Sequence, residues 1–180
     1  MKLALSIMTF LMSGTLLAGG TDVGNSGDST FQVASAKNLC LQGLETVLFS
    51  CSVVHNNKLK TVSVCQENTA NNVHYRFGQQ LDEVELKLSL FNTLSGDEAQ
   101  AAERNNPTSG EVLSVKFQSG AYTYEVWSQS GDHGPDSAGL NILKNGEYIS
   151  NMNCVEETKS KGFDLDSLGS SFPFSDGLNQ

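Results

Sequence analysis

A predicted β-hairpin near the start of the chain constrains the fold more than any other sequence feature. Residues 44–54 and 60–65 alternate between apolar and polar side chains, and the polar stretch His55-Asn56-Asn57-Lys58 separates them. Asparagine tolerates positive φ angles, so Asn56 and Asn57 suit the two central positions of a type I′ turn. The pattern therefore predicts two antiparallel strands joined by a two-residue turn.

The register of this hairpin limits how the cysteines can pair. The chain has four of them, Cys40, Cys51, Cys65 and Cys154. An even count without a Cys-x-x-Cys motif favours two disulfides in an oxidising compartment over a zinc site. In the predicted register Cys51 lies opposite Val62 and faces the core, whereas Cys65 points to the other face. A Cys51–Cys65 disulfide is thereby excluded. The residues expected on the core face with Cys51 are Val47, Phe49, Val53, Val62 and Val64.

Six further segments have the alternation and the β-branched or aromatic residues of strands. They are residues 73–78, 84–91, 112–118, 122–128, 138–144 and 147–154. Asn145-Gly146, between the last two segments, is a strong hairpin signal. The polar, alanine-rich residues 95–104 predict one or two helical turns in a loop. The predicted fold class is all-β: a single antiparallel meander of about eight strands, closed as a small barrel because closure removes exposed edges.

Closure of such a barrel would lay the last strand beside the first. Met152 and Cys154 share one face of the last strand, so Cys154 can meet Cys51 on the core face. Cys40 and Cys65 then remain to pair on the outer face. The sequence thus favours the disulfides Cys51–Cys154 and Cys40–Cys65.

The N-terminus predicts export. Lys2 precedes an apolar run that ends near Ala18, which is the layout of a secretory signal peptide. Cleavage is expected near residues 18–20 or, alternatively, after Ala36. Gly20 stands where a lipoprotein would need a cysteine, so we expect no lipid anchor.

The chain divides into four predicted regions. Residues 1–20 are the signal peptide, and residues 21–38 are a flexible leader with too few large apolar side chains to order itself. Residues 39–155 form the β-barrel domain. Residues 156–180 are an acidic and apolar C-terminal extension that either docks on the barrel wall or stays unstructured. The expected location is the periplasm or the cell exterior.

The acidic charge limits the classes of partner. The chain has 20 Asp and Glu against 11 Lys and Arg, which gives a net charge of -9. Nucleic acids and anionic membrane surfaces are repelled by such a protein. The same charge would speed encounter with a basic protein, or would simply keep an exported protein soluble.

The sequence contains no recognisable catalytic motif. His55, His74 and His133 have no partner at catalytic or metal-ligand spacing, and we expect them to be polar surface residues. The acidic pairs Asp82-Glu83 and Asp97-Glu98 lie in turn-like polar contexts, which favours solvated charge. Cysteines in disulfides offer no thiolate nucleophile. We therefore expect no enzymatic activity, no cofactor and no metal.

The loop Gly131-Asp132-His133-Gly134-Pro135-Asp136 is the alternative to that expectation. Asp132, His133 and Asp136 could gather over a barrel mouth, where carboxylates and an imidazole would hold a ligand or a metal. The other interpretation is a plain long hairpin loop. An enzyme or a ligand- or metal-binding protein would use this loop.

Several short motifs follow one another in a fixed order between Cys40 and Cys154. They are Phe-Ser-Cys at 49–51, Lys-Thr-Val-Ser-Val-Cys at 60–65, Tyr-Arg-Phe-Gly at 75–78, Val-Glu-Leu at 84–86, Gly-Ala-Tyr-Thr-Tyr-Glu-Val at 120–126, Ala-Gly-Leu at 138–140 and Asn-Gly at 145–146. This order resembles a family of small exported, disulfide-containing proteins of Gram-negative bacteria that has no assigned activity. The resemblance implies an exported protein and supplies no chemistry.

The segment Ser119-Gly120-Ala121-Tyr122, with Tyr124 after it, is similar to a loop of bacterial lysozyme inhibitors. Those proteins are periplasmic or lipid-anchored small β-barrels, often acidic and disulfide-bonded, and the loop enters the enzyme's cleft. In their motif a tyrosine follows Ser-Gly after two residues, so Tyr122 here comes one residue early and Tyr124 one late. The resemblance implies a partner-binding loop with a basic protein such as lysozyme as partner. Ser119-Gly120 also suits a tight turn between strands.

Overall fold

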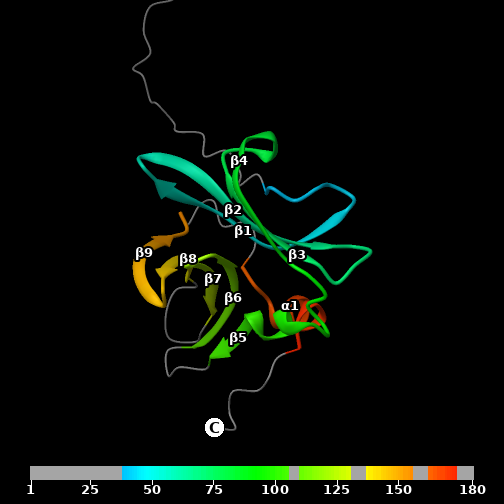
Figure 1. The fold of residues 1–180 in the computed structure, drawn as a ribbon. Helices are drawn as coiled ribbons and strands as arrows, with labels where there is room; N and C mark the ends of the chain where they lie inside the picture. Colours follow the sequence, from blue (N-terminus) through cyan, green and yellow to red (C-terminus); the bar gives the residue numbers. More distant parts are fainter. Residues whose placement is uncertain (1–37, 106–109, 131–136, 156–161, 174–180) are drawn as a thin grey trace, which may run out of the picture. The chain divides into compact units, whose positions relative to one another are not determined.

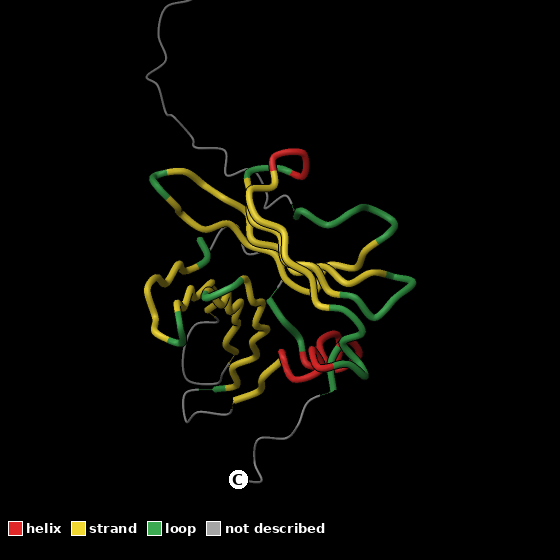
Figure 2. Tube along the Cα trace, viewed as in Figure 1, coloured by secondary structure: helices red, strands yellow, loops and turns green. Residues whose placement is uncertain are grey.

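The computed structural model describes residues 38–105, 110–130, 137–155 and 162–173, which all belong to one unit of residues 32–180. Within these residues nine antiparallel strands form two sheets (Figures 1 and 2). Sheet A contains β1 (Glu45–His55), β2 (Lys58–Glu67), β3 (Val73–Gly78) and β4 (Val84–Leu90). Sheet B contains β5 (Ala102–Asn105), β6 (Glu111–Ser119), β7 (Tyr122–Ser130), β8 (Ser137–Lys144) and β9 (Glu147–Asn153). The predicted signal peptide and all but the last residue of the predicted leader lie outside the described residues.

The β1–β2 hairpin has the predicted register. Asn56 and Asn57 adopt φ angles of 51° and 59°, as a type I′ turn requires, and Cys51 pairs with Val62. One prediction for this hairpin is wrong. A bulge between Val47 and Phe49 inserts Leu48, which is buried in the core, and turns Val47 to the opposite face of the sheet.

Sheet B contains a strand that the sequence pattern did not reveal. Residues 95–104 were expected to form helical turns in a loop. A 3-10 helix, η2 (Asp97–Ala101), does form there, but the chain then continues as the short edge strand β5. Ala102 pairs with Val115 of β6 and buries its methyl group in the core. One alanine followed by three polar residues gives too weak a period for a strand to be recognised from sequence.

The nine strands do not close into a barrel. On one side the first and last strands meet as predicted, through an isolated bridge between Val53 and Cys154 and a hydrogen bond from the Val155 N–H to the Ser52 carbonyl (2.8 Å). On the other side β4 and β5 belong to different sheets, and no strand of the described residues pairs with both. The prediction of a single closed meander is therefore corrected to two sheets, tied at one edge.

Both disulfides join the predicted pairs, Cys51 to Cys154 and Cys40 to Cys65. The first connects sheet A to the end of sheet B inside the core, where Cys51 is fully buried. The second lies on the opposite face of sheet A. Two disulfides are typical of an oxidising compartment, extracellular or periplasmic.

The core is shared by both sheets and by the C-terminal segment. After Cys154, residues 162–173 return to the core and form the short helix α1 (Leu165–Ser171), which begins with the Asp164 carboxylate accepting from the Ser167 N–H. Phe163, Leu168 and Phe172 are buried in the same cluster as the strands. Residues 162–173 of the predicted extension thus pack in the core. No helix in the described part of the chain has the length and apolar character needed to span a membrane.

Candidate functional site

The predicted partner-binding loop is the turn of the β6–β7 hairpin. Ser119 and Tyr122 form the last pair of the two strands, and Gly120 and Ala121 make the turn between them. Gly120 has a φ angle of +58°, which glycine adopts without a steric penalty. Ser119, Gly120 and Ala121 are exposed, and Tyr122 is 37% exposed. The turn that the sequence suggested thus exists, and it presents its residues to solvent.

A second hairpin turn supports this one from the side. The turn of β8–β9, at Asn145-Gly146, lies next to the β6–β7 turn, and the Asn145 N–H donates to the Ala121 carbonyl over 2.8 Å. Lys144 pairs with Tyr122 across β7 and β8, and its ammonium group lies 5.4 Å from the centre of the tyrosine ring. This is cation–π distance. We call residues 119–122 and 144–147 the double-hairpin tip.

Tyr124 does not belong to the tip. Along β7 it lies two residues beyond Tyr122 on the core face, with its ring centre 5.7 Å from that of Tyr75. Tyr75 also packs against Phe117 of β6, with the two ring centres 5.4 Å apart. Burial raises the pKa of Tyr75 far above its ordinary value, with a smaller contribution from Tyr124. Of the four predicted residues, the structure therefore brings Ser119, Gly120 and Tyr122 together on one surface and assigns Tyr124 to core packing.

The predicted ligand loop is outside the part of the chain that the structure describes. Asp132, His133 and Asp136 lie outside the described residues, between the end of β7 and the start of β8. The acidic pairs are placed at short 3-10 helices: Asp82-Glu83 in η1 (Leu81–Glu83) and Asp97-Glu98 at the start of η2. Asp97 and Glu98 also line a 430 Å³ cleft between η2, β4 and β6.

The prediction that His74 is a polar surface residue is wrong. His74 is buried on the outer face of sheet A, opposite Cys65. Its Nε2 lies 2.7 Å from a carboxylate oxygen of Glu67, and because a carboxylate only accepts, this nitrogen carries a proton. Its Nδ1 lies 2.8 Å from the hydroxyl of Ser89. The hydrogen bond from His74 lowers the pKa of Glu67, and a second one from Asn72 adds to the effect.

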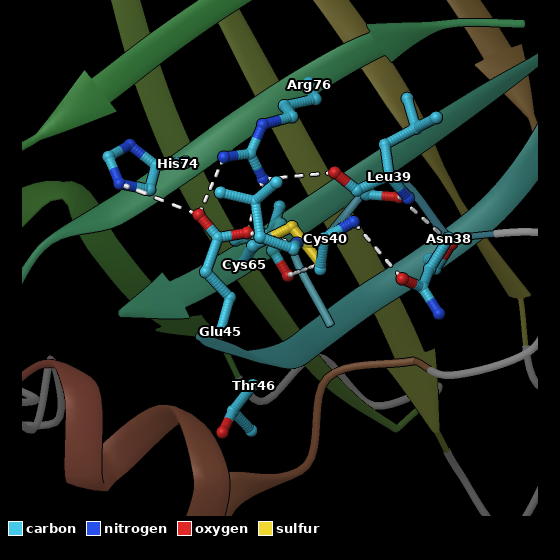
Figure 3. The surroundings of a disulfide bond; sticks show 12 residues. Asn38, Leu39, Cys40, Glu45, Thr46, Cys65, His74 and Arg76 are labelled. Atoms are coloured by element: carbon cyan, nitrogen blue, oxygen red, sulfur yellow. Dashed lines mark hydrogen bonds and ion pairs between the residues drawn. A yellow bond between two sulfur atoms is a disulfide. The ribbon is translucent and has the colours of Figure 1, made fainter. Parts of the chain in front are cut away.

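Next to His74 lies a buried ion pair (Figure 3). The Arg76 guanidinium donates to both carboxylate oxygens of Glu45, each over 2.6 Å, and the two side chains are only 4% and 3% exposed. Burial raises the pKa of Glu45. Hydrogen bonds from Arg76 and the Leu41 N–H, with the positive charge of Arg76, outweigh burial and hold that pKa below its ordinary value.

This cluster fastens the N-terminal segment to sheet A. Arg76 also donates to the Leu39 carbonyl over 3.1 Å, and the adjacent Cys40–Cys65 disulfide holds the same segment covalently (Figure 3). Potential ligand atoms of Cys40, Cys65 and Glu45 lie within 4.8 Å of one another. With both sulfurs in the disulfide, however, the group offers no thiolate to a metal. We therefore interpret this cluster as structural, and we call Glu45, His74, Arg76 and the Cys40–Cys65 disulfide the clasp.

Sequence reasoning missed the clasp although one signal pointed to it. In β3, His74 and Arg76 have the parity of the outer face, the face already assigned to Cys65 through the hairpin register. The segment that the Cys40–Cys65 disulfide holds on this face is therefore the segment expected to cover His74 and Arg76.

Comparisons of the chain with protein-family models, with curated proteins and with solved structures find no match.

Proposed function

We propose that this protein is an exported, non-enzymatic binding module of the lysozyme-inhibitor type, which holds a basic protein partner through the double-hairpin tip. The observation that carries the proposal is the support of one exposed hairpin turn by another. The hydrogen bond from Asn145 to Ala121 and the stacking of Lys144 on Tyr122 hold the Ser119–Tyr122 turn in one conformation.

A pre-ordered turn favours tight binding because little conformational entropy is lost when the partner docks. Tyr122 is the natural anchor of such a contact. Tyrosine is enriched among residues that dominate binding energy, since it buries a large ring at a low entropy cost and keeps a hydroxyl for hydrogen bonding. The net charge of -9 adds long-range attraction for a basic protein.

The direct test is a titration of the purified, oxidised protein into activity assays of several lysozyme types. We expect stoichiometric inhibition of at least one type, and a weaker effect at high salt because the attraction is electrostatic. Tyr122→Ala should raise the inhibition constant by about 30-fold, the loss expected for an interface anchor worth about 2 kcal/mol. Ser119→Ala should have a smaller effect in the same direction.

Phe91→Ala is the matched control, because Phe91 is an aromatic side chain that is 57% exposed and follows β4 of sheet A, away from the tip. It should inhibit as the unchanged protein does. If a stoichiometric excess of the unchanged protein inhibits none of the lysozymes, the lysozyme-inhibitor proposal is wrong. If Phe91→Ala loses as much inhibition as Tyr122→Ala, the tip is not the contact.

A further inference from the structure

The outer face of sheet B carries a tryptophan whose ring packs against a glycine. Trp127 of β7 pairs with Gly139 of β8, and both face away from the core because their neighbours Val126 and Leu140 are buried in it. A Cβ atom at Gly139 would lie 3.1 Å from both Cε2 and Cζ2 of the indole. The missing side chain therefore leaves room for the ring against the strand. The indole is only partly buried.

Packing sets the position of this ring. The indole N–H is buried and has no hydrogen-bond partner, although a buried tryptophan N–H usually finds one. Trp127 does not contribute to the core, because Tyr124, Val126 and Ser128 occupy the inward face of β7. A large aromatic surface placed on a sheet without a structural bond is suited to stacking with a ligand.

Next to the tryptophan, polar side chains form a continuous rung across the same face. The Asn141 amide donates to the Glu125 carboxylate over 2.9 Å, and the Asn151 amide donates to the Asn141 carbonyl oxygen over 2.6 Å. On the far side Lys116 donates to Glu103 over 2.6 Å and lies 3.8 Å from Glu125. The rung thus holds its own side chains in fixed orientations.

The rung keeps hydrogen-bonding capacity for a ligand. A carboxamide has two N–H donors and an acceptor oxygen, and these contacts use only one N–H each of Asn141 and Asn151. On the side away from Trp127, Tyr148 pairs with Leu143 and is 68% exposed. Gly139 and Leu143 are four residues apart on β8, so the two aromatic groups are separated by roughly 13 Å along the strand.

We propose that this face, with Trp127 and Tyr148 on either side of the Glu125–Asn141–Asn151 rung, binds a neutral oligosaccharide. A pyranose ring presents a C–H face that stacks on an aromatic ring and hydroxyl groups at its edge that bond to amides and carboxylates. A flat, pre-ordered surface with both features matches this chemistry. A peptide would instead need apolar pockets, or would pair with the edge of β9 and not lie across this face. The net charge of -9 disfavours acidic glycans. This site does not depend on the double-hairpin tip.

The single tryptophan of the chain makes the test direct, since intrinsic fluorescence reports on Trp127 alone. We would titrate the oxidised protein with three neutral trisaccharides, tri-N-acetylchitotriose, cellotriose and maltotriose, to millimolar concentration. At least one should produce a saturable change in emission. Asn141→Ala retains the fluorophore and should weaken that binding by roughly three- to tenfold, the effect of losing one hydrogen bond.

Two further variants complete the design. Because Trp127→Ala lacks the fluorophore, its binding is measured by titration calorimetry, and we expect none. Phe91→Ala should bind the trisaccharide as tightly as the unchanged protein. If Trp127→Ala does not fold, the Asn141→Ala titration decides alone. The proposal is overturned if no trisaccharide produces a saturable change, if Asn141→Ala binds as tightly as the unchanged protein, or if a neutral glycine–serine peptide gives the response and the sugars do not.

Discussion

Substitution of either partner of the Glu45–Arg76 pair should destabilise the protein strongly. The two side chains are 3% and 4% exposed and make two charge-assisted hydrogen bonds of 2.6 Å. Removal of one partner leaves the other charge buried, which costs about 3–5 kcal/mol. Glu45→Met and Arg76→Met should each lose that amount, a large share of the roughly 5–15 kcal/mol that holds a domain folded.

The double variant Glu45→Met/Arg76→Met separates this explanation from a simple loss of contacts. When both charges are absent, neither is left unpaired, and apolar side chains of similar length fill the space. The double variant should therefore be more stable than the sum of the two single losses predicts, by about 1–3 kcal/mol. Arg104→Met is the matched control. The side chains of its ion pair with Glu111 are 31% and 25% exposed, and its loss should cost about 1 kcal/mol or less.

Equilibrium unfolding in urea, with both disulfides oxidised, measures all four variants. The prediction is wrong if the single variants lose less than about 1 kcal/mol, because the pair would then be as weak as a surface pair. It also fails if the two single losses simply add. Either result would mean that the segment over Glu45 does not exclude water as the structure indicates.

The same pair predicts how stability changes in acid. Because the pKa of Glu45 is lower in the folded protein than its ordinary value of about 4.3, the unfolded chain binds a proton more readily. The stabilisation is fully present above pH 4.3 and is lost as the pH falls through the folded-state pKa. The unfolding free energy of the unchanged protein should thus fall more steeply below about pH 4.3 than that of Glu45→Met.

Two other predictions concern the core and its covalent ties. Replacing Cys51 and Cys154 by alanine opens a link between residues 103 apart and should cost about 4.7 kcal/mol, whereas replacing Cys40 and Cys65, 25 apart, should cost about 3.5 kcal/mol. Urea unfolding midpoints should follow that order, and a reversed order would show that local packing outweighs loop entropy. Phe172→Ala should lose about 3–5 kcal/mol, because Phe172 is fully buried in the shared core. A loss under about 1 kcal/mol would place the C-terminal segment outside the cooperative unit.

The hairpin register was predictable because it depends on local chemistry. Asn56 and Asn57 select the turn, the turn fixes the pairing of Cys51 with Val62, and side-chain parity then sends Cys65 to the other face. Each step needs only neighbouring residues. The same holds for the Gly120 and Asn145-Gly146 turns. The tip could thus be named in part, although its support of one turn by another joins residues 24 positions apart, Ala121 and Asn145, and leaves no local pattern.

The clasp around Glu45 could not be predicted in the same way. His74 and Arg76 look like polar residues of a half-exposed strand, and the alternation of β3 places them opposite the core. They are buried because the Cys40–Cys65 disulfide holds residues 38–44, the segment before β1, on that face. A sheet buried on both faces usually has continuous apolar strands, but here the covered outer face keeps polar side chains, so β3 alternates like a strand that is covered on one face only. The strand β5 was missed for a different reason, since its burial rests on Ala102 alone.

The C-terminal segment supplies core side chains that a closed barrel would take from its own strands. A closed barrel of this size is filled by its own side chains. Here Phe163 enters the core, its ring centre 5.1 Å from that of Phe49 in sheet A and its N–H bonded to the Ser128 hydroxyl of sheet B over 3.0 Å. Ser171 follows, with its carbonyl accepting from Thr93 over 2.6 Å, just beyond the end of β4. Residues 162–173 thus supply part of the core that the two sheets share, and they bond to both sheets, through Ser128 of β7 and Gln66 of β2. Residues 162–173 are therefore part of the architecture and not an appendage to the strands before them.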